Sequence, residues 1–326
     1  MADAADLTRA GSVRRAGRAR IGDYAPTYGA LAALILLLVF NAIFTTNFLD
    51  LNNFRNILLQ VAPTMLVAVG MTLVIATGGI DLSVGSVMAI ASAVAATSLD
   101  YGAGVAILLA LLVAALAGAF NGALISVFRI QPIIVTLALL ISGRGIAQVI
   151  SNGGQLVEFQ NAAFESLGKG LTGGIPVQVI VMLLVVLIAL FIMRATVFGR
   201  YVLAVGGNES AARLAGIKIH RTKIAVYAIS GLLAGLAGLI ETARLGASDA
   251  QKVGLNIELD AIAATVVGGT PLTGGRATVL GTLIGALIMQ VITTSFNMRG
   301  YSFSWGLVIK AVIILVAVYI QRPKMT

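Results

Sequence analysis

Ten apolar runs follow one another along this chain of 326 residues. A helix needs about 20 mostly apolar residues to cross the hydrocarbon core of a bilayer, since each residue advances it by about 1.5 Å. Most of the runs reach or approach that length, so the sequence predicts an all-α polytopic membrane protein with about ten transmembrane helices. The runs are 28–44, 57–76, 84–96, 104–128, 132–150, 175–193, 224–243, 257–267, 277–292 and 306–320.

The composition supports a membrane protein and excludes several kinds of site. Hydrophobic residues make up 59% of the chain and charged residues only 11%, against about 25% charged in soluble domains. A soluble fold of this length could not bury so much apolar surface. The chain has no cysteine, which excludes disulfides, thiol catalysis and thiolate metal sites. The single histidine, His220, leaves little material for a proton relay or a metal site, and we predict no metal site.

The basic residues indicate how the spans are oriented. If ten spans alternate and both termini are cytoplasmic, fifteen lysines and arginines fall on the inner side and five on the outer side. Cytoplasmic connections typically carry such an excess. The net charge of +9 therefore fits membrane topology, and we expect lipid and not nucleic acid as a partner. The inner residues are five arginines of the cytoplasmic basic tail 1–26, Arg129, six residues of the loop 194–223, Arg276, Arg322 and Lys324; the outer ones are Arg55, Lys169, Arg244, Lys252 and Arg299.

Two of the runs, 84–96 and 257–267, are too short to cross alone, and each adjoins a glycine-rich break. The breaks GGIDLSVGS (78–86) and GGTPLTGGR (268–276) share the pattern GGxxLxxGx. A helix can break at membrane depth only inside protein or beside a water-filled path. Paired breaks in corresponding places of two half-repeats therefore predict a transport pathway. Taken alone, each break is equally explained by a glycine turn. Eight spans with two re-entrant hairpins would also leave both ends inside.

The breaks supply the candidate pathway residues. Asp81 follows the first glycine pair, where it can cap the helix that begins near Val84, contact the transported solute, or do both. Two charges lie within predicted spans: Arg144 is expected to have a carboxylate or carbonyl partner, and Lys310 to pair or to extend to the interface. The candidate pathway set is Gly78, Gly79, Asp81, Ser83, Gly268, Gly269, Thr270 and Thr273.

The long basic loop 194–223 contains a second signal, GNESAARLAGI. Asn208 can act as the N-cap of a short helix, Glu209 complements its positive end, and Gly216 can take the left-handed position after its last turn. About seven residues would form a rod of about 10–12 Å, too short to span a membrane but suited to a groove of a soluble partner. The alternative is a helix that lies unused on the membrane surface. The candidate coupling residues are Asn208, Glu209, Ala212, Arg213, Leu214 and Gly216.

Four motifs carry a family resemblance: GMTLVIATGGIDLSVGS, AVGGNESAARLAGI, YAISGLLAGLAG and ELDAIAATVVGGTPLTGGR. In this order they resemble the inner-membrane permeases of ribose/xylose/arabinose/galactose-type ABC importers, over nearly the whole chain after residue 50. Segments 130–150 and 153–159 look most like the galactofuranose-type branch. The resemblance implies a bacterial inner-membrane protein that forms the path for a monosaccharide. It also implies a second permease copy or a related permease, two cytoplasmic ATPase subunits, a periplasmic sugar-binding protein, and ATPase coupling by the 208–217 helix.

The chain is not expected to be an enzyme. It contains no GxxxxGK[ST] loop to hold ATP phosphates, no GxSxG elbow and no HExxH helix. ATP and Mg would bind the partner ATPase, and no cofactor is expected on this chain.

Three other functions remain open. A branched-chain amino-acid ABC permease has a similar loop, although GGIDLSVGS favours sugars. A secondary transporter would need buried acidic or histidine relays, and a channel needs no coupling helix. The identity of the sugar is expected to rest largely with the binding protein.

Overall fold

The computed structural model describes residues 27–321. The basic tail 1–26, Arg322 and Lys324 lie outside the described residues. The cytoplasmic location of their positive charges therefore stays a prediction. The first helix is Thr27–Phe44. It is followed by α2 (Leu51–Ala76), α3 (Val84–Thr97), η1 (Leu99–Tyr101), α4 (Ala103–Ser126), α5 (Pro132–Ile150), β1 (Val157–Glu158), α6 (Ala162–Lys169), β2 (Leu171–Thr172), β3 (Ile175–Pro176), α7 (Val177–Ala195), α8 (Val197–Gly207), α9 (Glu209–Leu214), α10 (Ile219–Leu245), β4 (Ala247–Ser248), α11 (Ile257–Val267), α12 (Val279–Met298) and α13 (Phe303–Gln321).

Each predicted apolar run forms a helix over most of its length, as expected from the sequence, although Ile175 and Pro176 at the start of one run form β3. Within residues 27–321, seven helices are long and apolar enough to cross a membrane: Thr27–Phe44, α2, α4, α5, α7, α10 and α12. The two runs that adjoin the breaks form the short helices α3 and α11, of 14 and 11 residues. At about 1.5 Å per residue neither crosses the hydrocarbon core by itself. The prediction of a mostly helical membrane protein is confirmed, and α3 and α11 are as short as expected, whereas the number of about ten transmembrane helices stays a prediction.

Local chemistry explains several helix ends. The Asp50 carboxylate accepts a hydrogen bond from the amide of Asn52 at 2.9 Å, which caps the first turn of α2. Pro132 begins α5, where its missing amide proton leaves no helical bond unmade. The Asn161 side chain accepts from the amide of Phe164 and starts α6.

Helix α10 packs across α4 through small residues. A Cβ added at Gly118 would overlap the carbonyl oxygen of Tyr227, and one added at Gly231 would overlap that of Ala114. The two backbones therefore touch directly. Close approach of this kind lets van der Waals contact hold helices together where lipid gives no hydrophobic drive. Gly118 and Gly231 therefore serve helix packing at this crossing.

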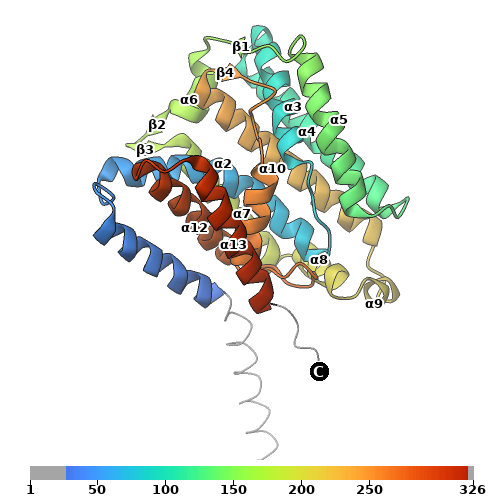
Figure 1. Ribbon diagram of the computed structural model, residues 1–326. Coiled ribbons are helices and arrows are strands. Elements are labelled where there is room, and N and C mark those ends of the chain that lie inside the picture. The colour runs from blue at the N-terminus through green and yellow to red at the C-terminus, as the bar shows by residue number, and fades with distance from the viewer. Residues whose placement is uncertain (1–26, 322–326) are drawn as a thin grey trace, which may run out of the picture.

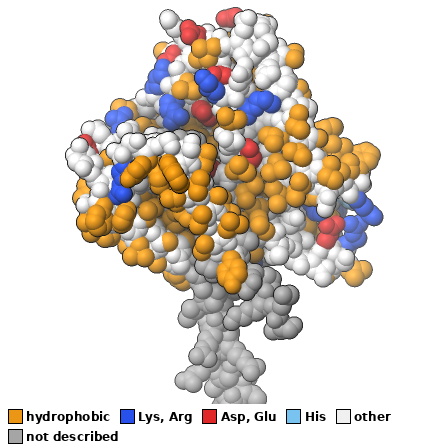
Figure 2. All heavy atoms as spheres, in the orientation of Figure 1, with side chains coloured by type: hydrophobic (Ala, Val, Ile, Leu, Met, Phe, Trp, Pro, Cys, Tyr) orange, Lys and Arg blue, Asp and Glu red, His pale blue; other side chains and the backbone are white. Residues whose placement is uncertain are grey.

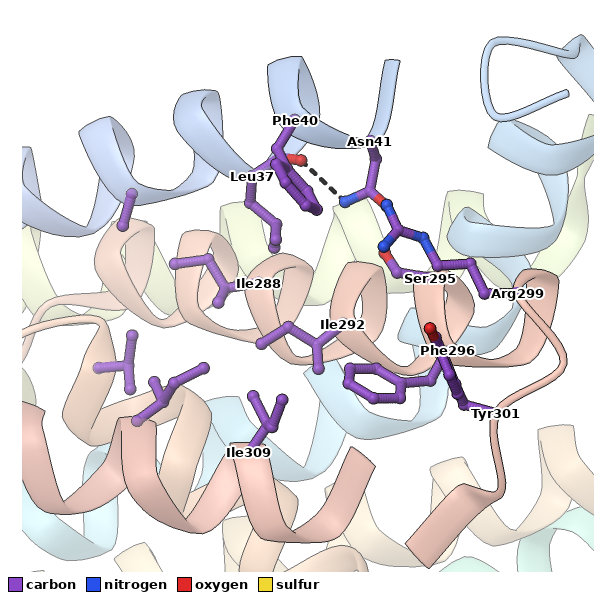
Figure 3. Close-up of a pocket in the computed structure, with 13 residues that line it drawn as sticks. Leu37, Phe40, Asn41, Ile288, Ile292, Ser295, Phe296, Arg299, Tyr301 and Ile309 are labelled. Carbon is purple, nitrogen blue, oxygen red and sulfur yellow. Dashed lines mark hydrogen bonds between the residues drawn. The ribbon is translucent and has the colours of Figure 1, made fainter. Parts of the chain in front are cut away.

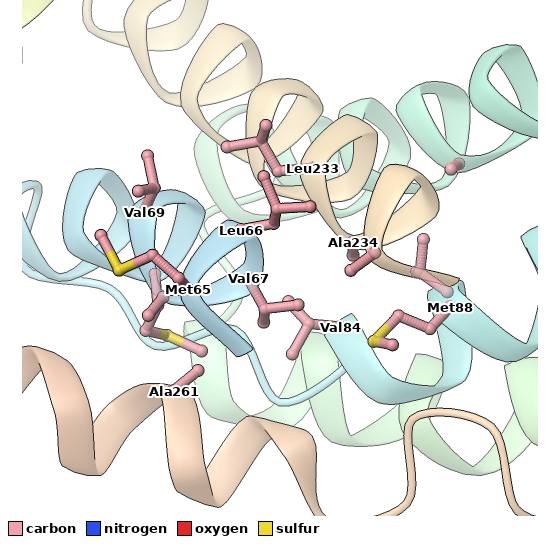
Figure 4. Packing of buried hydrophobic residues seen from close by; sticks show 14 of the residues in the cluster. Met65, Leu66, Val67, Val69, Val84, Met88, Leu233, Ala234 and Ala261 are labelled. Carbon is pink, nitrogen blue, oxygen red and sulfur yellow. The ribbon is translucent and has the colours of Figure 1, made fainter. Parts of the chain in front are cut away.

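The core lies where α2, α3, α10 and α11 meet, as Figure 4 shows. Val67 of α2 lies beside Val84 of α3, and Leu66 of α2 lies beside Leu233 of α10. Leu233 and Ala234 of α10 and Ala261 of α11 complete this cluster. The C-terminal half of α2, from Met65 to Ala76, is buried on all sides, so it lies at the centre of the bundle.

On the face shown in Figure 2, hydrophobic side chains gather around the middle of the bundle and charged side chains gather mainly towards its ends. One end carries α6 and the pair β1–β4, in which Val157 lies opposite Ser248. The other end carries α9, and the described chain also starts and finishes towards that end (Figure 1).

Candidate transport pathway and coupling helix

Both predicted breaks interrupt the helices where the glycine pairs stand. Helix α2 ends at Ala76 and Gly78 has a φ of 78°; α11 ends at Val267 and Gly269 has a φ of 97°. Residues with a Cβ rarely adopt this left-handed backbone, so glycine is required at both turns. The two breaks are local backbone reversals of the same kind.

The tertiary structure brings the two breaks into contact, although they are about 190 residues apart. The amide of Gly275 donates a hydrogen bond to the carbonyl oxygen of Ala76 at 3.0 Å. A Cβ added at Gly274 would lie 2.8 Å from the amide nitrogen of Gly78. Two backbone segments therefore meet with no side chain between them, at the end of the bundle that carries α8 and α9.

Asp81 is the centre of a buried polar network between three helices. Its carboxylate is 1% exposed. Oδ1 accepts from the amide and the hydroxyl of Ser83 at 3.0 and 2.6 Å, and Oδ2 accepts from the hydroxyl of Ser230 on α10 at 2.8 Å. Asn121 of α4 donates to the Ser83 hydroxyl at 3.0 Å. Within residues 27–321, no lysine or arginine lies within ion-pair distance of Asp81.

The predicted capping role of Asp81 needs a correction. The N-cap position of α3 is Ser83, and its own side chain makes no capping bond. Asp81 binds the amide of that residue and so closes the turn that leads into the helix. Its second oxygen is committed to α10, a contact that no local pattern could reveal.

Two polar groups beside this network have no hydrogen-bond partner within the described residues: Asn121 Oδ1 and Tyr227 Oη. Both side chains are 1% exposed. A Cβ added at Gly79 would overlap Tyr227 Oη, so this hydroxyl faces the first break. Sequence reasoning did not single out Asn121, Tyr227 or Ser230. Tyr227 and Ser230 begin the quoted motif YAISGLLAGLAG, but nothing in that local pattern indicates a polar network with Asp81.

The second break is held against the start of α12. Thr270 is buried, and its hydroxyl lies 3.0 Å from the Thr278 hydroxyl and accepts from the Thr278 amide at 3.1 Å. The Thr278 hydroxyl donates to the carbonyl oxygen of Gly268 at 3.0 Å. Thr273 is exposed at the turn. Of the predicted pathway residues, Asp81, Ser83 and Thr270 are thus buried and hydrogen-bonded inside the protein.

A cavity of about 460 Å³ lies between the first helix, α12 and α13, with Val267 at the end of α11 also in its lining (Figure 3). Leu37, Ile288 and Ile292 line it with apolar side chains. Near one end, Arg299 donates to the Thr45 hydroxyl at 3.0 Å and stacks on the ring of Phe40. No predicted pathway residue lines this cavity.

The short helix predicted in the basic loop is present as α9. The Asn208 side chain accepts from the amide of Ala211 at 2.9 Å. At the other end, the amide of Ile217 donates to Ala212 and that of Gly216 to Arg213, both at 3.0 Å. With Gly216 at a φ of 81°, these bonds form a Schellman motif. Both predicted caps are confirmed, and both depend only on neighbouring residues.

Charge pairs brace α9, and its tip stays apolar. Glu209 binds Arg213 at 3.2 Å and Lys223 of α10 at 2.7 Å. The hydrogen bond from Lys223 holds the pKa of Glu209 below its usual value. Ala212 packs against α8 and the start of α10, whereas Leu214 is 91% exposed. Helix α9 is therefore held in place by these contacts, and it exposes Leu214, which a binding partner can reach.

The two charges predicted inside spans have partners. Arg144 donates to the carbonyl oxygens of Ala250 and Val253 at 3.0 and 2.7 Å. Lys310 of α13 pairs with Asp260 of α11 at 2.8 Å. Both expectations of a structural partner are confirmed. The Arg144 bonds hold the segment that precedes α11 against α5.

Residues 53–318 match a protein family described as branched-chain amino acid transport system / permease component. The chain belongs to this permease family. This permease is also similar to three curated proteins whose names specify sugars. It is 43% identical to the ribose import permease protein RbsC of Escherichia coli (strain K12), over 90% of this chain and 93% of that protein. It is 40% identical to the galactofuranose transporter permease protein YtfT of the same strain, over 90% and 89%.

The third relative is the fructose import permease protein FruF of Bifidobacterium longum, at 38% identity over 90% of this permease and 87% of the relative. No solved structure matches the chain. The resemblance to sugar-importer permeases is thus confirmed, and it favours sugars over branched-chain amino acids despite the family description. The galactofuranose-type protein is one of several comparable relatives, so that branch is not singled out.

Proposed function

We propose that this chain is the permease subunit of an ABC importer and forms the inner-membrane path for a monosaccharide. The observation that carries the proposal is similarity to the ribose import permease across nine tenths of both chains. The capped helix α9 with its exposed Leu214 supports coupling to a soluble partner. ATP hydrolysis lies on a separate ATPase subunit, and the chain itself needs no cofactor.

The proposed assembly has three kinds of component. Two permeases, either two copies of this chain or this chain and a related one, form the path across the membrane. Two cytoplasmic ATPases bind the loop 194–223, and a periplasmic sugar-binding protein delivers the substrate. One transmembrane domain, 27–322, carries the path, and the basic tail 1–26 lies in the cytoplasm.

Uptake by the reconstituted importer tests this function. The permease with its ATPase and binding protein, in proteoliposomes, is expected to accumulate radiolabelled ribose, fructose or galactofuranose in an ATP-dependent manner. Leucine is the matched solute from the rival class and should not accumulate. A complex whose ATPase lacks its phosphate-binding lysine serves as the control. Uptake of leucine without any sugar would overturn the proposal.

The proposed topology places α6 outside and α9 inside, with both termini cytoplasmic and with α3 and α11 as partial spans. The asymmetric distribution of basic residues supports this orientation. Because the native chain lacks cysteine, exposed positions can be labelled without background. Ala163→Cys is expected to react with an impermeant thiol reagent from the periplasm, and Lys218→Cys only after the membrane is opened. Labelling of both from the periplasm would refute the orientation.

The proposed pathway follows the two breaks. In the structure the two breaks pack against each other, and Asp81, Ser83 and Thr270 are buried, so the proposed path is closed at this point. Opening it would expose Asp81 together with Asn121 and Tyr227, whose unpaired oxygens can exchange hydrogen bonds with sugar hydroxyls. Gly78, Gly79, Gly268 and Gly269 would supply the turns, and Thr273 the accessible end of the path.

The variant Asp81→Asn separates a structural from an electrostatic role. Asparagine keeps the acceptor for the Ser83 amide, and the Ser230 hydroxyl can accept from its new NH₂ group. Near-native uptake is therefore expected. Asp81→Leu leaves those donors unpaired at a cost of about 1–3 kcal/mol and should lower the thermal stability of the purified protein. Loss of uptake by an assembled Asp81→Asn complex would assign the charge itself to the path.

A further inference from the structure

Helices α8 and α9 are joined by a single residue. Asn208 is both the C-cap of α8 and the N-cap of α9. The last two residues of α8, Gly206 and Gly207, therefore stand directly before the helix proposed to bind the ATPase. Because no flexible linker separates the two helices, a displacement of α9 also moves Gly206 and Gly207.

Gly206 lies against both glycine breaks. A Cβ added there would overlap the carbonyl oxygen of Ala76 and would lie 2.7 Å from the amide nitrogen of Gly275. The same carbonyl oxygen accepts the hydrogen bond from Gly275. A Cβ added at Gly274 would lie 3.0 Å from the carbonyl oxygen of Gly206. We call these residues, with Gly78, the glycine junction: Ala76, Gly78, Gly206, Gly274 and Gly275.

The glycine junction is a contact of three backbones. A side chain at such a contact could change rotamer and absorb a small movement, whereas backbone atoms in van der Waals contact cannot. Any shift of the end of α8 must therefore displace the end of α2, the segment after α11, or both. The end of α2 is further tied to α10, because Asp81 binds Ser230.

We propose that the glycine junction transmits the movement of α9 to both halves of the transport path, which makes Gly206 a positioning residue for transport. The proposal rests on the proposed function, since it needs an ATPase that moves α9. It specifies the route of the movement. A shift of α9 passes through Asn208 to Gly206, and Gly206 then displaces both breaks together. Coupling through packed elements with two discrete arrangements needs such a contiguous contact.

Adjacent glycines provide a matched pair of variants. At Gly207 an added Cβ would approach only the Cα of Gly275, at an ordinary 3.9 Å, whereas at Gly206 it cannot fit without moving the breaks. In the complete importer, Gly206→Ala is expected to lower sugar uptake roughly tenfold or more. Stimulation of the ATPase by the loaded binding protein should also fall, whereas co-purification and basal hydrolysis persist. Gly207→Ala should resemble the native protein. Equal uptake by the two variants would overturn the proposal.

A reversible crosslink tests the same contact if Gly206→Ala does not assemble. Cβ atoms added at Gly207 and Gly275 would each lie within 3.9 Å of the other residue's Cα, which suits a disulfide with Cβ atoms about 3.8 Å apart. The pair Gly207→Cys and Gly275→Cys should crosslink in native membranes. Because the end of α8 and the second break move together in this proposal, the oxidised form should keep the uptake that its reduced form has; that reduced form is the reference, since Gly275 has a φ of 78°. Gly207→Cys alone should be insensitive to oxidant.

Two outcomes of the crosslink experiment contradict the proposal: no disulfide forms, or oxidation abolishes the uptake of the double variant, which would show that the end of α8 and the second break must separate during transport. Failure of the proposed function itself looks different. In that case the native importer takes up no sugar, and the comparison of variants has no starting activity.

Discussion

Replacing Leu214 with aspartate is expected to abolish sugar uptake while the spans stay folded. Leu214 is 91% exposed at the tip of α9 and contributes nothing to the packing of the chain itself. Burial of a leucine in a partner's groove contributes about 1.5–3 kcal/mol. An aspartate would instead carry a charge into that groove, which costs more than the lost contact. The ATPase should no longer co-purify, or should no longer be stimulated.

Two controls separate docking from folding in this experiment. Leu214→Met keeps an apolar side chain of similar volume and should transport almost normally. The elution profile and the melting temperature of detergent-solubilised Leu214→Asp should match those of the native protein. Normal uptake by Leu214→Asp would show that α9 is an idle surface helix and would remove the proposed coupling site.

The second large effect is expected at Gly268, the first residue of the second break. A Cβ added there would overlap the backbone carbonyl group of Gly281 and lie 2.5 Å from the amide nitrogen of Thr282. Backbone of α12 cannot move aside as a side chain can. Gly268→Ala should therefore force α11 away from α12 at a cost of about 1–3 kcal/mol or more. We expect a lower melting temperature together with loss of uptake.

Gly145 offers the matched control, because it is a helical glycine with nothing within 4 Å of an added Cβ. Alanine at an open helical site removes backbone freedom from the unfolded chain and stabilises by about 0.5–1 kcal/mol. Gly145→Ala should therefore melt at or slightly above the native temperature and transport normally. If Gly268→Ala behaves like Gly145→Ala, the backbone contact between the second break and α12 does not constrain the protein.

Local features were predictable because their causes lie within a few residues. Every apolar run became a helix, since the requirement to satisfy each backbone group in lipid leaves few alternatives. Helix α9 runs from Glu209 to Leu214, between the capping side chain of Asn208 and the left-handed Gly216. The need for turns at Gly78 and Gly269 was likewise visible from the glycine pairs.

The sequence by itself determined a helical membrane protein, its short broken segments, its capped loop helix and its family. Only the tertiary structure decided what those parts touch. Asp81 is bound to Ser230, 149 residues away, and Lys310 to Asp260. The two breaks meet each other and the end of α8, which no spacing along the chain could indicate. Caps and spans follow from short-range chemistry, whereas contacts between helices depend on how all of them pack at once.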